Sequence, residues 1–426
     1  MNRRVIVFVT SCAMLLSGAN LIAQPQTPTI RFLNGRWFNG KSFDERVVYS
    51  VNGVFAAAAP RRVDTTVDLH GSYVVPPFAD AHNHNVEFYG TPRLKALISM
   101  YLRDGVFYDQ NPDNLPRARD SLAGVVNVLG GIDAIFANGG LTGTDGHPTG
   151  LFRRNLAAGV FTPADGDGGL LWYIDSAADL DRKWPRILAQ HPDFIKTYLL
   201  YSEEYAKRRN DTAYFNWKGL NPALLPAIVR RAHEAGLRVM THIETAADFH
   251  NALTAGADEI GHIPGFRGDE HGKMADLARY IIADADAALA ARNKTIVITT
   301  VAGTANAISR TGPDSLLRRR LDSLHTRNLR TLERHGVALA IGSDNYRTTS
   351  MPEAFYIDSL GIFSNARLID LWSRATSQAI FPGRKIGVLA PGYEASFLVL
   401  PSDPLRDFSA AGRITLRVKQ GRILTP

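Results

Sequence analysis

The sequence predicts a closed (β/α)8 barrel of the TIM type, flanked by a small β-sandwich that the N-terminal and C-terminal segments build together. Residues 75–382 alternate short apolar strands with amphipathic helices, as the units of a parallel barrel do. Short strands separated by turn signals such as Asn-Gly lie on either side of this region. A doubly wound sheet is the alternative, but it usually carries a glycine-rich phosphate loop after its first strand, and that strand ends in His-x-His here.

The first residues have the pattern of a targeting signal. Two arginines precede a mostly apolar stretch over 5–23, and Ala23 offers a cleavage point. A retained membrane helix would need about 20 uninterrupted apolar residues, whereas polar residues interrupt this stretch. Lipidation of Cys12 is another alternative, but the apolar run before that cysteine is short. We therefore expect a signal peptide over 1–23, a periplasmic or secreted protein, and no stable membrane anchor after cleavage.

Composition limits the partners. Of the 426 residues, 45% are hydrophobic and 21% are charged, which is ordinary for a globular protein. Cleavage would remove Cys12, the one cysteine, so the mature chain would have no disulfide. It would leave 46 basic and 41 acidic residues, a net charge of +5. The arginine-rich run over 318–334 follows leucines at helical spacing, which predicts the exposed face of an outer helix rather than a nucleic-acid site.

The elements follow one another in three blocks. Residues 24–74 are expected to form the N-terminal part of the sandwich, with strands at 30–32, 36–38, 46–51 and 63–69. The barrel is expected over 75–382, with strands at 75–81, 105–108, 132–137, 194–198, 237–243, 259–263, 295–300 and 337–341. Its helices are expected at 97–103, 222–235, 246–255, 269–292, 316–334, 352–361 and 367–380. Residues 383–426 complete the sandwich with strands at 396–400, 414–418 and 422–424.

Two histidines end the first barrel strand. Alternate residues of a strand point to the same side, and the strand rises about 3.3 Å per residue. His82 and His84 are therefore expected to project together, close enough to hold one metal ion. The pair alone is weak support for a metal site, because many His-x-His pairs lie on surfaces without a ligand.

Later strands also end in side chains that can bind metal. In a barrel of this kind the chemistry lies at the carboxyl ends of the strands. Lys196 lies in an apolar strand, His242 and His262 end the next two strands, and Asp344 ends the last. Taken singly, Lys196 could extend to solvent, the histidines could be core residues, and Asp344 could be a turn residue. Their common position on one rim favours a shared site.

The ordered set His82, His84, Lys196, His242, His262 and Asp344 resembles the binuclear metal centre of the amidohydrolase superfamily. Two further stretches are similar to that superfamily, namely 75–84 around the first strand and 387–400 near the C-terminus. Phe78 stands where a glycine is usual, and Ser396 where an aspartate is usual. The loop 139–150 and the strand 193–196 resemble the imidazolonepropionase-like and prolidase-like branch.

The resemblance implies a mechanism and its cofactors. It implies two divalent ions, with zinc suited to histidine and carboxylate ligands, and carboxylation of Lys196, whose carbamate would bridge them. The ions would lower the pKa of a bridging water. Asp344 would then act as general base and acid besides binding metal. His147, on the long loop, would hold a substrate carboxylate or stabilise the oxyanion.

The sequence therefore predicts an exported metal-dependent amidohydrolase acting on a C–N bond of a small or dipeptide-like substrate. Two alternatives stay open: a phosphoester or lactone hydrolase using the same binuclear site, and a non-catalytic metal-containing binding protein. The loops 138–150, 201–220 and 264–273 are expected to set specificity. No nucleic-acid partner is expected, and a homo-oligomer is left open.

Overall fold

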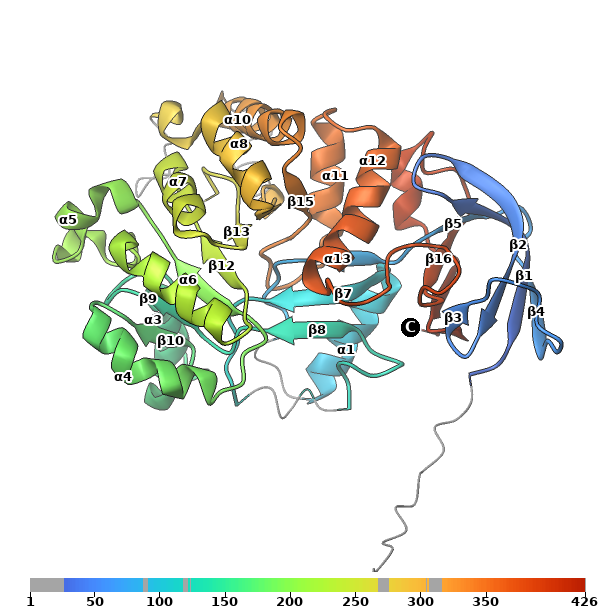
Figure 1. The fold of residues 1–426 in the computed structure, drawn as a ribbon, viewed down its shortest axis with the longest axis horizontal. Coiled ribbons are helices and arrows are strands. Elements are labelled where there is room, and N and C mark those ends of the chain that lie inside the picture. Colours follow the sequence, from blue (N-terminus) through green and yellow to red (C-terminus); the bar gives the residue numbers. More distant parts are fainter. Residues whose placement is uncertain are drawn as a thin grey trace, which may run out of the picture.

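The computed structural model describes residues 27–86, 91–117, 122, 124–266, 276–303, 305 and 316–425. The predicted signal peptide lies outside these residues. A barrel of parallel strands covered by helices lies beside a separate sheet at one end of the molecule (Figure 1). The predicted fold class, a barrel with a small β unit built from both ends of the chain, is confirmed.

No helix of the described residues is long and apolar enough to cross a membrane.

The barrel strands follow one another in chain order and pair in parallel within two arcs. Backbone hydrogen bonds beyond the strand ends join the arcs, from Ala81 N to Ile341 O at 2.8 Å and from Asp193 N to Phe136 O at 2.8 Å. The strands are β6 (Phe78–Asp80), β7 (Val106–Asn111), β8 (Asp133–Phe136), β9 (Gly140–Thr142), β11 (Ile195–Tyr198), β12 (Val239–His242), β13 (Glu259–Gly261), β14 (Ile296–Ile298) and β15 (Ala338–Ala340), with β10 (Leu171–Tyr173) beside β9.

Helices connect these strands, and their ends follow local sequence signals. Helix α7 begins with a capping box between Thr245 and Asp248 and ends at Gly256, whose φ of 85° suits glycine. Most leucines of α10 are buried, as the prediction of an outer helix requires, whereas Leu316 at its start is exposed. The helices are α1 (Thr91–Arg103), α3 (Thr149–Ala157), α4 (Ala177–Leu188), α5 (Tyr205–Arg208), α6 (Leu225–Glu234), α7 (Ala246–Ala255), α8 (Asp284–Asn293), α10 (Leu316–Arg334), α11 (Met351–Ser359), α12 (Asn365–Asp370) and α13 (Thr376–Ile380).

Several predicted elements differ in the structure: the strands expected at 30–32 and 36–38 are one strand, the loop expected at 138–150 contains a strand at Gly140–Thr142, and two longer elements divide. The long helix expected at 269–292 begins outside the described residues, and its described part is a 3₁₀ turn at Leu277–Tyr280 followed by α8. That prediction is wrong because Ile281 and Ala283 have extended backbone, held where Ile282 N–H donates to the Asn328 side chain at 3.0 Å.

The apolar run expected as one strand over 75–81 also divides. Its first residue belongs to the flanking sheet and its second half forms β6 in the barrel. Pro76 and Pro77 lie at the division. Proline has no N–H to donate to a ladder, so the two prolines mark the point where the chain leaves the sheet for the barrel.

The flanking unit joins both ends of the chain in one eight-stranded sheet. Strand β1 pairs with β4 along its first half and with β5 along its second, and β5 pairs with β16 from the C-terminal segment. Phe32, Trp37 and Phe397 form its aromatic core, with ring centroids 4.9–5.0 Å from Phe397. Its strands are β1 (Ile30–Phe38), β2 (Phe43–Val51), β3 (Val54–Phe55), β4 (Thr65–Asp68), β5 (Tyr73–Val75), β16 (Phe397–Leu400), β17 (Leu416–Lys419) and β18 (Arg422–Ile423).

A buried ion pair attaches this sheet to the barrel. Lys419 Nζ, at the end of β17, lies 2.6 Å from Asp133 at the start of β8 and donates to the Gly131 carbonyl at 2.7 Å. We expect Lys419→Met to lower the free energy of unfolding by about 3 kcal/mol, since the substitution leaves a buried carboxylate with less compensation. Urea denaturation measures this, with Lys385→Met at an exposed position as the control. Equal midpoints for the two variants would contradict the expectation.

Candidate metal centre

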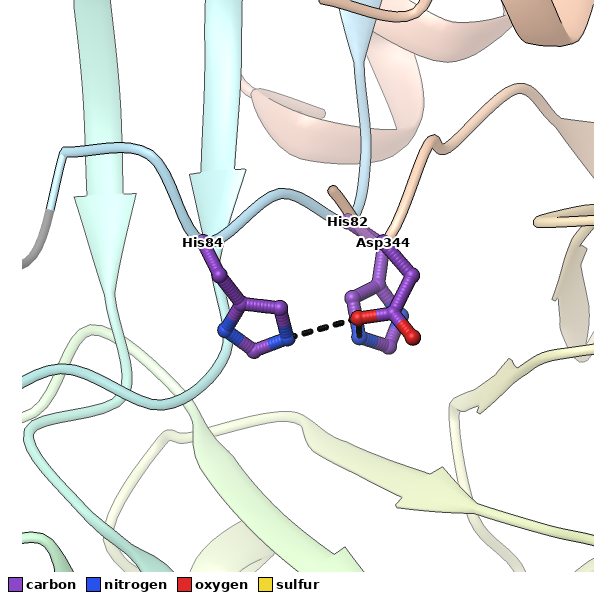
Figure 2. A group of neighbouring side chains, drawn as sticks. All are labelled: His82, His84 and Asp344. Carbon is purple, nitrogen blue, oxygen red and sulfur yellow. Dashed lines mark ion pairs between the residues drawn. The ribbon is translucent and has the colours of Figure 1, made fainter. Parts of the chain in front are cut away.

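Three of the predicted metal ligands form a close group. Among the described residues, His82, His84 and Asp344 offer ligand atoms that all lie within 4.8 Å of one another (Figure 2). Asp344 Oδ1 lies 2.8 Å from His84 Nε2 and 3.5 Å from His82 Nε2. The strands that deliver them, β6 and β15, are the first and last of the barrel, which its closure makes neighbours.

The backbone around this group is held by the buried carboxylate of Asp80. Asp80 accepts hydrogen bonds from the Ser343 hydroxyl at 2.7 Å, the Ser343 N–H at 3.0 Å and the Asn83 side chain at 3.1 Å. In addition, the N–H groups of Ser343 and Asp344 both donate to the His82 carbonyl. Asp344 has a φ of 44°, a left-handed conformation that is rare outside glycine. Such conformations cost about 1–3 kcal/mol and are concentrated at functional sites.

The other predicted ligands continue the group along one wall of the barrel. The imidazole rings form a row from His84 through His82, His262 and His242 to His147, with successive centroids 5.3, 4.6, 4.3 and 4.8 Å apart. His262 is fully buried, and its Nδ1 lies 2.6 Å from the Thr300 hydroxyl. Lys196 Nζ lies 3.5 Å from Met240 Sδ. The structure thus brings all the predicted site residues to one end of the barrel.

Gly261 permits the approach of two of these side chains. A Cβ added there would lie 3.1 Å from ring atoms of His82 and 3.4 Å from Lys196 Nζ, so both side chains pack against the bare Cα. We expect Gly261→Ala to lower kcat/KM about 10-fold, since shifts well below 1 Å in a catalytic group already cost rate. Gly383→Ala, where a Cβ meets no atom within 4 Å, is the control. An unchanged rate and metal content in Gly261→Ala would show that His82 and Lys196 adjust without cost.

Burial and charge set the ionisation of the group. Burial, together with the neighbouring Lys196, lowers the pKa of His82 well below its usual value. Burial alone would raise the pKa of Asp344, but the His82 and His84 imidazoles outweigh it and hold that pKa well below the usual range. The arrangement therefore favours a neutral imidazole at His82 and an ionised carboxylate at Asp344, the protonation states that metal binding requires.

The residues present fit divalent metal. Imidazole nitrogens and a carboxylate are suitable ligands for zinc and related ions. A ligating imidazole usually donates its second N–H to an outer partner. His82 Nδ1, by contrast, is buried and makes no hydrogen bond to any described residue. Asp344, His82 and His84 could hold one ion, and Lys196, His242 and His262 lie where a second could be held.

The group opens into a cavity of about 860 Å³. Two of the loops predicted to set specificity contribute to its wall through His147, Pro148 and Gly150, and through Phe215, Asn216 and Trp217. The third contributes Phe266, and the rest of that loop beyond residue 266 lies outside the described residues. A cavity of this size is suited to a small-molecule substrate.

Sequence reasoning missed several residues that line the cavity. Phe266 stacks on His262 with centroids 4.0 Å apart, and Tyr346 stacks on His84 at 5.0 Å. Tyr198, on β11, lines the cavity together with the buried Asp113. Asp113 follows β7, and no motif marked it. Its sequence signal is limited to an acidic residue shortly after an apolar strand.

His147 lies where the long loop meets α3. Its ring is 4.8 Å from the His242 ring and 5.4 Å from the Tyr198 ring, so it faces the same cavity as the metal-binding group. Its N–H donates to the Lys218 carbonyl at 2.8 Å, which ties two of the specificity loops together. The position is compatible with contact to substrate.

Comparison with known proteins agrees with the geometry. The model of the Amidohydrolase family matches residues 217–424. An Xaa-Pro dipeptidase with methionine bound in its active site has a TM-score of 0.70 at 16% identity, over 93% of this chain and 100% of that one. Ochratoxinase of A. niger has a TM-score of 0.70 at 16% identity, over 94% of this chain and 96% of that one. A prolidase complexed with N-methylphosphonate-L-proline has a TM-score of 0.67 at 16% identity, over 93% of this chain and 99% of that one.

At these identities the solved structures support the fold, and the family model matches the C-terminal half of the chain. No curated protein sequence matches the chain. The predicted resemblance to the amidohydrolase superfamily is confirmed by the family match over residues 217–424, and the likeness to prolidase-like enzymes is a likeness of fold.

Proposed function

We propose that this chain belongs to the amidohydrolase family and is a metal-dependent hydrolase that cleaves the amide bond of a small dipeptide-like substrate. The observation that carries the proposal is the row of imidazoles from His84 to His147, with Asp344 beside it, at the wall of one cavity. The match to the Amidohydrolase family and the likeness to peptide-cleaving enzymes support the reaction class.

In this proposal, His82, His84, His242, His262, Asp344 and a carboxylated Lys196 hold two divalent ions, with zinc suited to these ligands. When bound, such ions lower the pKa of a water molecule and polarise the carbonyl under attack. The buried surroundings of the histidines strengthen these interactions, because charges interact more strongly where water is excluded.

Asp344 is the proposed proton carrier. Hydrolysis joins the water oxygen to the carbonyl carbon and breaks the C–N bond, and one proton of the water has to reach the leaving nitrogen. The carboxylate of Asp344 is ionised at neutral pH and can take that proton and return it. His147, whose ring lies 4.8 Å from the His242 ring in the same cavity, would donate a hydrogen bond to the substrate.

The cavity wall fits a substrate with an apolar part and an anionic end. Phe215, Trp217, Phe266 and Leu317 supply apolar surface. Arg154 of α3 also lines the cavity. The adjacent Arg153 pairs with Asp145 at 2.7 Å, whereas Arg154 makes no ion pair with a described residue. An arginine in this position suits the carboxylate of a dipeptide or of an N-acyl amino acid.

From the predicted signal peptide we further propose that the enzyme acts outside the cytoplasm, in the periplasm or the medium. Mass spectrometry tests this on protein purified from the extracytoplasmic fraction, and an N-terminus produced by cleavage after Ala23 is expected.

The test of the proposed function is hydrolysis of a panel of dipeptides and N-acyl amino acids by protein loaded with zinc, manganese or cobalt. Release of free amino acid is expected with metal and is expected to stop after chelation. A phosphodiester and a lactone are included in the panel. Turnover of these two alone would overturn the proposed reaction class while leaving the metal site in place.

A further inference from the structure

The buried carboxyl group of Asp113 lines the cavity but has no part in the proposed metal site or proton transfer. Asp113 follows β7, is 2% exposed and lines the cavity. The Tyr198 hydroxyl donates a hydrogen bond to its carboxyl group. The second oxygen, Oδ1, is buried and makes no hydrogen bond within the part of the chain that the structure describes. An unsatisfied buried carboxylate oxygen is costly in an empty site and suits a ligand that donates to it.

Tyr198 itself is held in place, so the carboxyl group is oriented before any ligand binds. The ring packs against Gly140 of β9, where an added Cβ would lie 2.4 Å from ring atom Cε2. The His147 ring meets it edge to face at 5.4 Å, and Lys196 Nζ lies 5.3 Å from its centroid. A ring confined on these sides keeps its hydroxyl, and hence Asp113, in one position.

The contacts of Tyr198 locate Asp113 near the residues proposed to hold metal. The Tyr198 hydroxyl donates a hydrogen bond to Asp113, its ring lies 5.5 Å from the His242 ring, and Lys196 Nζ lies 5.3 Å from its centroid. His84 and Asp344 line the same cavity as Asp113. Asp113 therefore offers a buried carboxyl group beside the residues proposed to hold metal, and it is not among the group of three closest ligands.

We propose that Asp113 binds the free α-amino group of the substrate, which makes the substrate a dipeptide with an unblocked N-terminus rather than an N-acyl amino acid. The proposal rests on the proposed function and narrows it. The α-amino nitrogen is two bonds from the carbonyl carbon that is attacked, so its partner has to lie next to the catalytic group, as Asp113 does. An ammonium also makes a stronger hydrogen bond to a carboxylate than a neutral amide N–H does.

The two ends of a dipeptide would then meet opposite charges. Asp113 would take the ammonium beside the strand ends, and Arg154 on α3 would take the carboxylate. Tyr198 acts through Asp113 and is a positioning residue in this arrangement.

The experiment compares a dipeptide with its N-acetyl derivative on metal-loaded protein. L-alanyl-L-phenylalanine and N-acetyl-L-alanyl-L-phenylalanine are the first pair, followed by the same pair made from the dipeptide that the panel shows to be cleaved best. Wild type is expected to favour the free amine by about 10-fold or more in kcat/KM. Asp113→Asn keeps the shape and an acceptor for Tyr198, and it is expected to lower kcat/KM for the free dipeptide on the order of 50-fold.

The same variant is expected to change kcat/KM for the N-acetyl derivative by less than about 3-fold. Tyr198→Phe is expected to shift the ratio of kcat/KM between the free and the N-acetylated dipeptide in the same direction by a smaller amount, mainly through KM. Asp167→Asn, an acid that pairs with Lys183 at 2.7 Å, is the matched control, and circular dichroism checks the fold of each variant.

The outcomes separate the two proposals. Equal losses on both substrates in Asp113→Asn, or a wild type that favours the N-acetyl derivative, would overturn the role of Asp113 and leave the proposed hydrolase standing. If Asp113→Asn does not fold, Tyr198→Phe decides, because an unchanged ratio in that variant counts against the proposal. Absence of any hydrolysis by metal-loaded wild type, across the whole panel, would overturn the proposed function itself.

Discussion

Replacing Lys196 by alanine is expected to lower the metal content from about two ions per chain to about one or none, and hydrolysis on the order of 10³-fold. A lysine with its ordinary pKa near 10.4 is a poor ligand. Here Lys196 is buried, and burial disfavours a charged ammonium. An uncharged Nζ can form a bond to CO₂ and release one proton, which converts it into an anionic carbamate.

Elemental analysis measures the metal content of wild type and variant, each purified with bicarbonate present. Lys183→Ala is the control, since it also removes a buried lysine but one that pairs with Asp167 beside α4. Carbon-13 NMR with labelled bicarbonate gives a readout independent of activity, because a carbamate carbon is expected in wild type and absent in Lys196→Ala. An identical metal count in both proteins, with no carbamate signal, would contradict a bridging role for Lys196.

The fold was largely predictable because strand and helix periods alternate over a long stretch. The errors in the elements have local causes. Pro76 and Pro77 divide an apolar run that periodicity alone joins. The stretch expected to be a loop at 138–150 contains β9, because after Asn138 and Gly139, with φ of 55° and 97°, the chain resumes a strand that pairs with β11, whereas β8 pairs with β7. Such backbone turns depend on which neighbouring strand each part of the chain pairs with, and the hydrophobic pattern of the sequence does not show that pairing.

The candidate site was predictable where its residues end strands. His82, His242, His262 and Asp344 could be found because barrel topology brings strand ends to one rim. Asp113 could not, because it lies in the connection after β7, where the sequence has no periodic pattern. Its partner Tyr198 does lie on a strand, but whether a strand tyrosine packs in the core or lines a cavity depends on Gly140 of a different strand.

Asp344→Asn is expected to lower kcat by about 10³-fold or more while leaving the protein folded. General base and acid catalysis by a positioned carboxylate is worth about 10²–10⁴-fold, and asparagine keeps the shape of the side chain but cannot carry a proton. The backbone at this position does not depend on the carboxylate, since the N–H of Asp344 is held by the His82 carbonyl and asparagine tolerates its positive φ. Asp286→Asn, at an acid that pairs with His250 on the outer helices, is the control.

Metal content separates the two roles assigned to Asp344. If it acts chiefly as proton carrier, Asp344→Asn keeps most of its metal, KM changes little and kcat falls. If it acts chiefly as ligand, metal content falls with activity, and excess zinc restores part of the rate. A kcat within about 10-fold of wild type at full metal occupancy is incompatible with either role. His147 would then be a candidate for moving the proton, because it lies in the same row of imidazoles and faces the same cavity.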